Sequence, residues 1–503
     1  MMTMLRTRST RIARSFALAL LVLATVGAAL GLSTRAAHAD MVSVAGALGG
    51  PERDVEQSRV ALDPVGGHAL VVWRADADGT GTSSIIGRSL DSGSGAPVGA
   101  PFVVAAAPGG TGTSVSDVRV IWDPRGEFLV AYTRDALPDV GGVVADEFQV
   151  WVQRVATDGT RIGAPMRVST PASVSGGISD SLRPDLAIDP SNGSVLVVWQ
   201  SDNPSYGLAP EEFEIVGSLL TRSNAGDLVD ATDVRLSWTG TDGDPATDAR
   251  RPAVAYDRVA HRWMVVWEAT RGVTGLPVQI EGRVLDEGGA LRGEQFRVDD
   301  GQEAHDVSIV SDTRDGGFGV GWTSTDASGT SVVLAVLDAS GSTVGGPIAI
   351  DGGGDGGAPW LHIHFDPHMR RYTALWVAET LVPPRREVRI QQLDDRGRLL
   401  GAARTIASPR PDANGVNVSA QSPDVVVGPL GRVVVVWVAA DPPATAAGQN
   451  EVWAATFEPS ALGFLPATGS DSTELALIGG AVLIIGVALT TGSMLVARRR
   501  RRN

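Results

Sequence analysis

The chain has 503 residues, of which 43% are hydrophobic, and it contains 12 Trp and 61 Gly. This composition is too apolar for an intrinsically disordered protein. The chain has no Cys and no Lys, so all 42 basic residues are Arg. These absences exclude disulfides, thiolate metal sites, cysteine nucleophiles and Schiff-base chemistry. The formal net charge of −15 disfavours nucleic acids and anionic membranes as partners.

The first 39 residues have the pattern of a secretory signal peptide. Four Arg in residues 6–14 precede an apolar run over 16–32, and Ala37-His38-Ala39 follows. Signal peptidase requires small residues at the positions of Ala37 and Ala39, so we expect Asp40 to begin the mature protein. The alternative is an uncleaved membrane anchor at this end. In either case residues 1–39 do not belong to the folded domain.

The other end of the chain carries three elements in a fixed order. Leu465-Pro466-Ala467-Thr468-Gly469 comes first, an apolar span over 475–497 follows, and residues 498–503 are rich in Arg. The span is long enough to cross a bilayer, and the Arg tail is typical of a cytoplasmic stop. Together these elements resemble the sorting signal of LPxTG proteins, which sortase anchors to the cell wall of Gram-positive bacteria. The use of Arg in place of Lys, with abundant Ala and Gly, is similar to actinobacterial sequences.

The resemblance implies a place in the cell and a covalent partner. Sortase would cleave between Thr468 and Gly469 and join the Thr468 carbonyl to an amine of the peptidoglycan. The protein would then be secreted, held briefly in the membrane by 475–497, and fixed in the wall. Because pilus shafts are joined through a lysine, a chain without Lys is not a shaft subunit. An ordinary single-pass membrane protein is the alternative.

Between the two ends, a pattern repeats seven times over residues 40–457. Each copy except the last has four short runs rich in Val, Ile and aromatic residues, separated by Gly, Asp and Pro, which is typical of strands. An aromatic residue ends the second run of every copy. These residues are Trp73, Tyr132, Trp199, Trp267, Trp322, Trp376 and Trp437.

Four antiparallel strands at a period near 60 residues predict an all-β, seven-bladed β-propeller. Asp-Pro pairs mark tight turns between the first two strands of several copies, as at Asp63-Pro64 and Asp189-Pro190. The last copy has a third strand over 451–457 but no fourth. We expect the strand-like run 41–45 to complete that blade and close the ring. A linker over 458–464 leads to the sorting motif. A β-sandwich array or a β-solenoid is the alternative fold.

Long, irregular connections fall on one face of the predicted ring, and we expect ligands to bind there. Tyr206, Trp238 and Trp360 lie in or beside these connections and are candidates for stacking on sugars. The sequence singles out no catalytic residue. We therefore expect a non-catalytic adhesion module that binds glycans or proteins through this face. The alternative is a wall-anchored carbohydrate-active enzyme, a glycosidase or lyase, that uses carboxylates on the same face.

Two patterns resemble metal sites, although we expect no cofactor. His362, His364 and Asp366 share one face of a strand, but they are in register with the repeat, so a structural role is favoured. Asp76 and Asp78 resemble the start of a calcium loop. Residue 87, where such a loop needs a carboxylate, is Gly. Calcium therefore stays an unsupported possibility.

Overall fold

The structure is a computed structural model, in which the described residues all belong to the second of two units, 42–503. The described ranges are 42–44, 53–76, 82–107, 114–135, 147–171, 179–272, 276–327, 329–352, 360–381, 384–407, 410–411, 417–418, 420–428, 431–440 and 450–457. The predicted signal peptide, linker, sorting motif, apolar span and Arg tail lie outside these ranges, as does Asp78. Within them, no helix is both long and apolar enough to cross a membrane.

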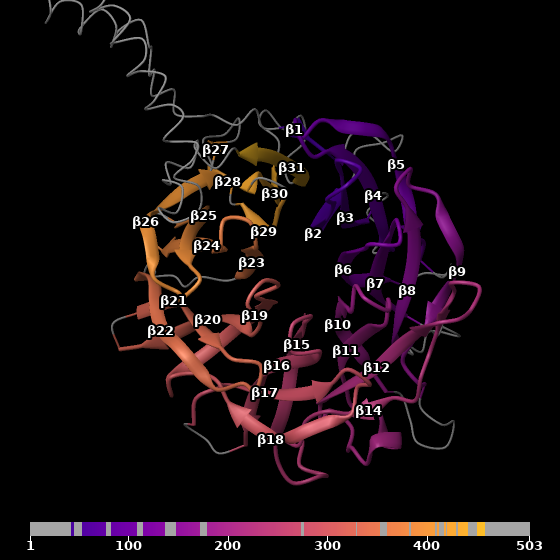
Figure 1. The fold of residues 1–503 in the computed structure, drawn as a ribbon, viewed down its shortest axis with the longest axis vertical. Helices are drawn as coiled ribbons and strands as arrows, with labels where there is room; N and C mark the ends of the chain where they lie inside the picture. The colour runs from indigo at the N-terminus through magenta and orange to yellow at the C-terminus, as the bar shows by residue number, and fades with distance from the viewer. Residues whose placement is uncertain are drawn as a thin grey trace, which may run out of the picture. The chain divides into compact units, whose positions relative to one another are not determined.

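Seven sheets are arranged as blades around a central axis, which confirms the predicted propeller and excludes the array and solenoid alternatives (Figure 1). Blade 1 contains β2 (Arg53–Asp63), β3 (His68–Asp76), β4 (Ser84–Asp91) and β5 (Pro97–Ala105). Blade 2 contains β6 (Val115–Asp123), β7 (Glu127–Asp135), β8 (Phe148–Ala156) and β9 (Arg161–Arg167). Blade 3 contains β10 (Ser181–Ile188), β11 (Val195–Ser201), β12 (Glu214–Arg222), β13 (Leu228–Val229) and β14 (Val234–Arg235). A short 3-10 helix, Pro204–Tyr206, lies between β11 and β12.

The remaining four blades follow the same antiparallel order. Blade 4 contains β15 (Thr247–Asp257), β16 (Arg262–Arg271), β17 (Gln279–Asp286) and β18 (Leu291–Arg297). Blade 5 contains β19 (Glu303–Ser311), β20 (Phe318–Asp326), β21 (Gly329–Leu337) and β22 (Thr343–Gly352). Blade 6 contains β23 (His362–Asp366), β24 (Arg371–Leu381), β25 (Pro384–Asp394) and β26 (Leu399–Ala407). Blade 7 contains β29 (Gln421–Val427), β30 (Val433–Ala440), β31 (Asn450–Phe457) and β1 (Val42–Ser43), and the pair β27 (Arg410–Pro411) and β28 (Asn417–Val418) precedes it.

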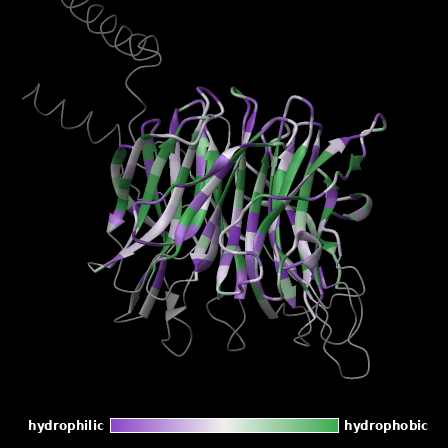
Figure 2. Ribbon diagram, turned by 90° about the horizontal axis from the view of Figure 1, so that it is seen from below, coloured by the Kyte–Doolittle hydropathy of each residue, from purple (hydrophilic) through white to green (hydrophobic). Residues whose placement is uncertain are grey.

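The repeated aromatic residues form the packing between blades. All seven are at most 2% exposed, and each lies on the second strand of its blade. In side view the hydrophobic residues follow the strands, while the turns that join them are mostly hydrophilic (Figure 2). The burial of one aromatic side chain per blade therefore explains the period of the sequence repeat.

Aspartates build the turns that join the first two strands of the blades. Asp63 Oδ1 accepts hydrogen bonds from the backbone N–H groups of Val65 and Gly66, both at 2.9 Å. Asp189 Oδ1 accepts one from Ser191 at 2.8 Å. The same contact is made by Asp257 and Asp312, which no Pro follows. The carboxylate, rather than the proline, is thus the common part of the turn.

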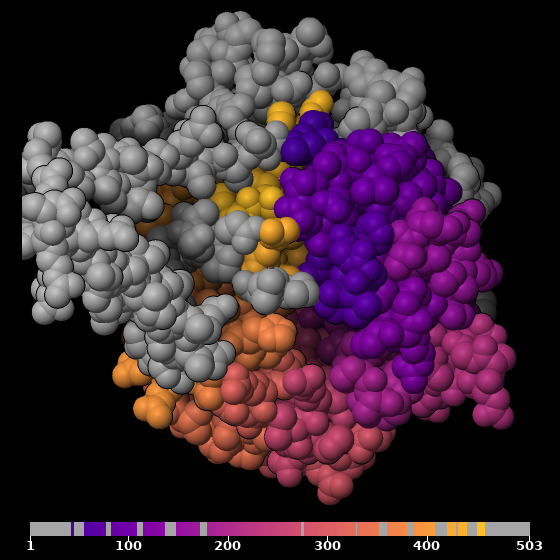
Figure 3. All heavy atoms as spheres, turned by 45° about the horizontal axis from the view of Figure 1, so that its top comes forward, coloured from indigo at the N-terminus to yellow at the C-terminus, as the bar shows by residue number. Residues whose placement is uncertain are grey.

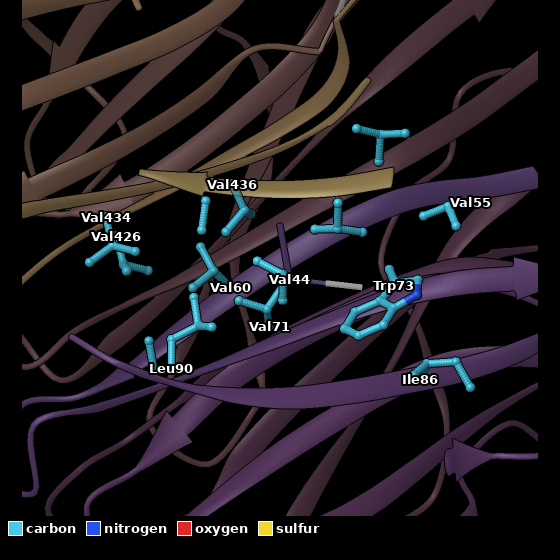
Figure 4. Close-up of a cluster of buried hydrophobic side chains, with 14 of the residues drawn as sticks. Val44, Val55, Val60, Val71, Trp73, Ile86, Leu90, Val426, Val434 and Val436 are labelled. Carbon is cyan, nitrogen blue, oxygen red and sulfur yellow. The ribbon is translucent and has the colours of Figure 1, made fainter. Parts of the chain in front are cut away.

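The N-terminal strand closes the ring, as the sequence predicted. Strand β1 pairs with β31, with Val42 opposite Ala454 and Ser43 opposite Trp453. The Val44 N–H donates to the Val452 carbonyl at 2.8 Å, and the Val44 side chain is fully buried. Figure 4 shows Val44 among side chains of blades 1 and 7. The indigo N-terminal segment accordingly lies against the yellow end of the propeller in Figure 3.

Candidate functional site

A cavity of about 870 Å³ lies along the axis of the ring, and all seven inner strands line it. These strands are β2, β6, β10, β15, β19, β23 and β29. Its volume is in the range of small-molecule and cofactor sites. We call it the channel.

A ring of seven residues with left-handed backbone surrounds one end of the channel. Each has a φ between 47° and 56°, and none is Gly. In six blades the register of the inner strand shifts at this residue, which is the mark of a β-bulge. Such a conformation costs about 1–2 kcal/mol at a non-glycine residue, and bulges re-aim side chains. We call these residues the mouth ring: Gln57, Asp117, Arg183, Arg251, Asp306, Trp360 and Ser422.

Two residues further along each strand, a second ring lines the channel. We call it the charged ring, and its members are Arg59, Arg119, Asp185, Ala253, Ser308, His362 and Asp424. Charged or titratable groups come from blades 6, 7, 1, 2 and 3. Blades 4 and 5 contribute only small side chains. At the level of the charged ring, the side chains of blades 4 and 5 are therefore smaller than those of the other five blades.

The two carboxylates of the charged ring are fixed by the neighbouring blade. Asp185 Oδ2 accepts the backbone N–H of Val254 at 2.9 Å, and Asp424 Oδ2 accepts that of Val60 at the same distance. Burial raises the pKa of both carboxyl groups, against the opposing effect of nearby arginines. Raised carboxyl pKa values in a cavity are typical of acid–base sites.

A third carboxylate, Asp306 of the mouth ring, lies on the side of blades 4 and 5. Its Oδ1 is 3.3 Å from a guanidinium nitrogen of Arg251, and its side chain is 26% exposed. Burial, and then the charge of Glu268, raises the pKa of Asp306. Asp185 also contacts blade 4, through Val254. Asp185 of blade 3 and Asp306 of blade 5 thus both contact blade 4. The small residue Ala253 lies between the two residues of blade 4 that they contact, Val254 and Arg251.

The two histidines of the β23 pattern line the channel. His362 Nδ1 is 3.7 Å from Asp424 Oδ1, and burial with the nearby Arg59 and Arg119 lowers the pKa of His362. Burial lowers the pKa of His364 to about 4. Asp366 instead caps its turn and accepts the His368 backbone N–H at 2.8 Å.

Among the residues that the structure describes, no group of three or more His, Asp or Glu side chains is arranged to hold a metal ion. Asp76 is buried at the end of β3.

The three aromatic candidates lie in different places. Trp360 belongs to the mouth ring, with the Arg386 guanidinium 5.5 Å from its ring centroid. Trp238 is 41% exposed and exchanges two hydrogen bonds with Gln295 of the outer strand β18, so it lies at the periphery of the ring. Tyr206 donates its hydroxyl hydrogen bond to Asp233 at 2.5 Å.

Neither the mouth ring nor the charged ring was predicted from the sequence as a set. A signal was present, because Arg183 and Arg251 hold the same position before Pro in two aligned copies. The β-bulge that directs the side chain at this position into the channel forms only in the folded strand, so the sequence alone does not show it.

No protein-family model matches the chain, and neither does any curated protein. Solved structures with a similar fold are found at low sequence identity. The Trypanosoma rangeli sialidase in complex with sialic acid is 8% identical, with a TM-score of 0.44 over 82% of this chain. The chain spans only 55% of that sialidase.

Two further structures are fungal proteins in complex with arabinobiose. The GH93 α-L-arabinofuranosidase of Fusarium graminearum is 14% identical, with a TM-score of 0.41, and the match covers 84% of this chain and 98% of that one. The Penicillium chrysogenum α-L-arabinanase is 13% identical, with a TM-score of 0.42, and the match covers 68% of this chain and 94% of that one.

These comparisons correct the prediction of a non-catalytic adhesion module. The three solved structures named above are a sialidase, an α-L-arabinofuranosidase and an α-L-arabinanase. At such identities the likeness concerns the fold alone, and one fold hosts many functions. Any activity of this chain therefore depends on its own residues in the channel.

Proposed function

We propose that the propeller is a glycosidase that binds a glycan at the mouth of the channel. The observation that carries the proposal is the approach of two carboxylates with raised pKa, Asp185 and Asp306, to blade 4. Glycoside hydrolysis commonly uses a pair of carboxyl groups, one protonated and one ionised. A cavity lined by two partly buried carboxylates meets this need.

The surroundings suit the two groups to different roles. Burial, and then the charge of Glu268, raises the pKa of Asp306 even though Arg251 lies 3.3 Å away, so we assign Asp306 as the proton donor to the leaving oxygen. Asp185 has Arg119 at 3.6 Å from its Oδ1, and this cation favours the ionised form. Asp185 is therefore the carboxylate that acts as nucleophile or base. The Val254 N–H holds it in position at 2.9 Å.

The test replaces each carboxylate with the isosteric amide. Asp185→Asn and Asp306→Asn should each lower kcat by about 100-fold or more, with little change in melting temperature. The matched control is Asp227→Asn, because that side chain is 69% exposed and pairs with Arg154. Turnover that survives in both channel variants, or falls equally in the control, would contradict the assignment.

We also propose that sortase anchors this enzyme in the wall through Thr468, with Leu465 to Gly469 as the recognised motif. The support is the order of motif, apolar span and Arg tail in the sequence. Mass spectrometry of wall fragments should find peptidoglycan joined to Thr468. Recovery of the chain with its residues 470–503 intact would argue against anchoring.

A further inference from the structure

Arg59 is a buried cation in the channel, and among the described residues no carboxylate lies within ion-pair distance of it. The residue is only 7% exposed, and one guanidinium nitrogen donates to the Ser58 carbonyl at 2.7 Å. Its Nε has no hydrogen-bond partner in the structure, and no carboxylate of the described residues forms an ion pair with it. Buried charges in proteins are normally paired, because desolvation of an ion costs several kcal/mol.

A second guanidinium increases the positive charge at this point. Arg119 follows Arg59 in the charged ring, on the next blade. Burial, and then the charge of Arg119, lowers the pKa of Arg59 to about 9, although Asp424, Asp185 and Asp117 act in the opposite direction. Arg119 is 31% exposed, its Nε is 3.6 Å from Asp185, and another of its nitrogens donates to the Val118 carbonyl at 3.1 Å. Two like charges thus lie on neighbouring blades of the charged ring, and of these two only Arg119 forms an ion pair with a described carboxylate.

We propose that Arg59 and Arg119 bind an anionic group of the substrate, so that the glycan is acidic. A carboxylate or a sulfate would accept charge-assisted hydrogen bonds from both guanidinium groups and offset the cost of burying Arg59. This inference rests on the proposed glycosidase function, and it specifies the substrate class of the same site.

The position of Arg59 and Arg119 determines where a bound anion would lie relative to Asp185. Arg119 contacts Asp185, which is the proposed nucleophile or base and itself contacts blade 4. A sugar whose anionic group faces blades 1 and 2 would therefore place its ring near Asp185 of blade 3. The charged ring then both selects the substrate and orients it.

The test measures binding by calorimetry at pH 7 with sugars that differ only in charge. The probes are glucuronate and galacturonate, the 6-sulfates of glucose and galactose, and the neutral hexoses. We expect at least one anionic sugar to bind tenfold or more tightly than its neutral counterpart. Comparison of the uronates with the sulfated sugars shows whether the site prefers a carboxylate or a sulfate. Equal affinity of charged and neutral sugars would overturn the proposal.

Two variants separate binding from folding. Arg59→Met should abolish the preference for the anion while leaving the melting temperature of the free protein unchanged or higher, because it removes an unpaired buried charge. The control is Arg292→Met, since Arg292 is 64% exposed on blade 4. A purely structural Arg59 would instead lower the melting temperature and leave the preference intact.

The same proteins distinguish this inference from the function on which it rests. Cleavage of neutral oligosaccharides with no preference for acidic ones would keep the glycosidase and overturn the anion site. Binding of anionic sugars that depends on Arg59, without cleavage of any acidic oligosaccharide, would support the anion site and contradict the glycosidase.

Discussion

Closure of the ring by β1 predicts a local effect of truncating Val44. The side chain is fully buried between blades 7 and 1, and Val44→Ala removes two methyl groups from that packing. At ~0.8 kcal/mol for each buried carbon, with a contribution from the cavity left behind, the loss is about 2 kcal/mol. Opening of β1 would leave β31 as a free sheet edge.

Hydrogen exchange measured by mass spectrometry reads this opening directly. A loss of about 2 kcal/mol predicts amide exchange in β31 roughly 30-fold faster in Val44→Ala than in the wild type. Val98→Ala is the matched control, because Val98 lies on the outer strand β5 and is 43% exposed. Exchange in β31 that changes less than threefold, or changes equally in the control, would refute the closure argument.

Three further predictions concern stability. His364 has its pKa lowered to about 4, so folding loses about 2 kcal/mol between pH 8 and pH 5, as the unfolded chain takes up the proton first. In denaturant titrations, the free energy of unfolding of His364→Gln should fall by about 2 kcal/mol less between pH 8 and pH 5 than that of the wild type. The same fall in both proteins would contradict the lowered pKa of His364. Hydrogen bonds with Glu268 and Glu303 raise the pKa of His305, so its contribution is full below pH 6.5 and is lost as pH rises through the folded value. Melting curves of His305→Gln should therefore show more destabilisation at pH 5.5 than at pH 8.5, and the reverse order would contradict the contact. Trp267→Ala should lower the free energy of unfolding in urea by about 3–5 kcal/mol, whereas a loss below 1 kcal/mol would show that the blade aromatic is dispensable.

The architecture was predictable because the same positions of every blade are buried. One aromatic residue such as Trp199 is buried per copy, and a carboxylate such as Asp189 holds each turn, so both recur at a fixed place in the sequence. The strand 41–45 was assigned to the last blade because that blade lacked a fourth strand. Such features depend on local sequence patterns and on the number of strands in each copy, and both can be read from the sequence.

The site was less predictable, because it consists of residues that the repeat does not share. Arg59, Asp185 and Asp424 hold one position of the repeat, but only the closed ring brings them to one axis. The inward turn of Asp306 depends on a bulge, and a bulge in a strand has no sequence signature as strong as a turn. Trp360 and Trp238 were both predicted to lie on the ligand-binding face. Trp360 lies at the mouth of the channel, whereas Trp238 lies at the periphery of the ring.

The central claim is that the channel cleaves a glycan rather than only holding it. The most direct measurement incubates the wild type and Asp306→Asn with a panel of acidic and neutral polysaccharides, and scores retained glycan and released reducing ends in the same samples. The account predicts that the wild type releases reducing ends from an acidic glycan, while the variant retains that glycan and releases almost none. Retention by the wild type without any release would contradict the account.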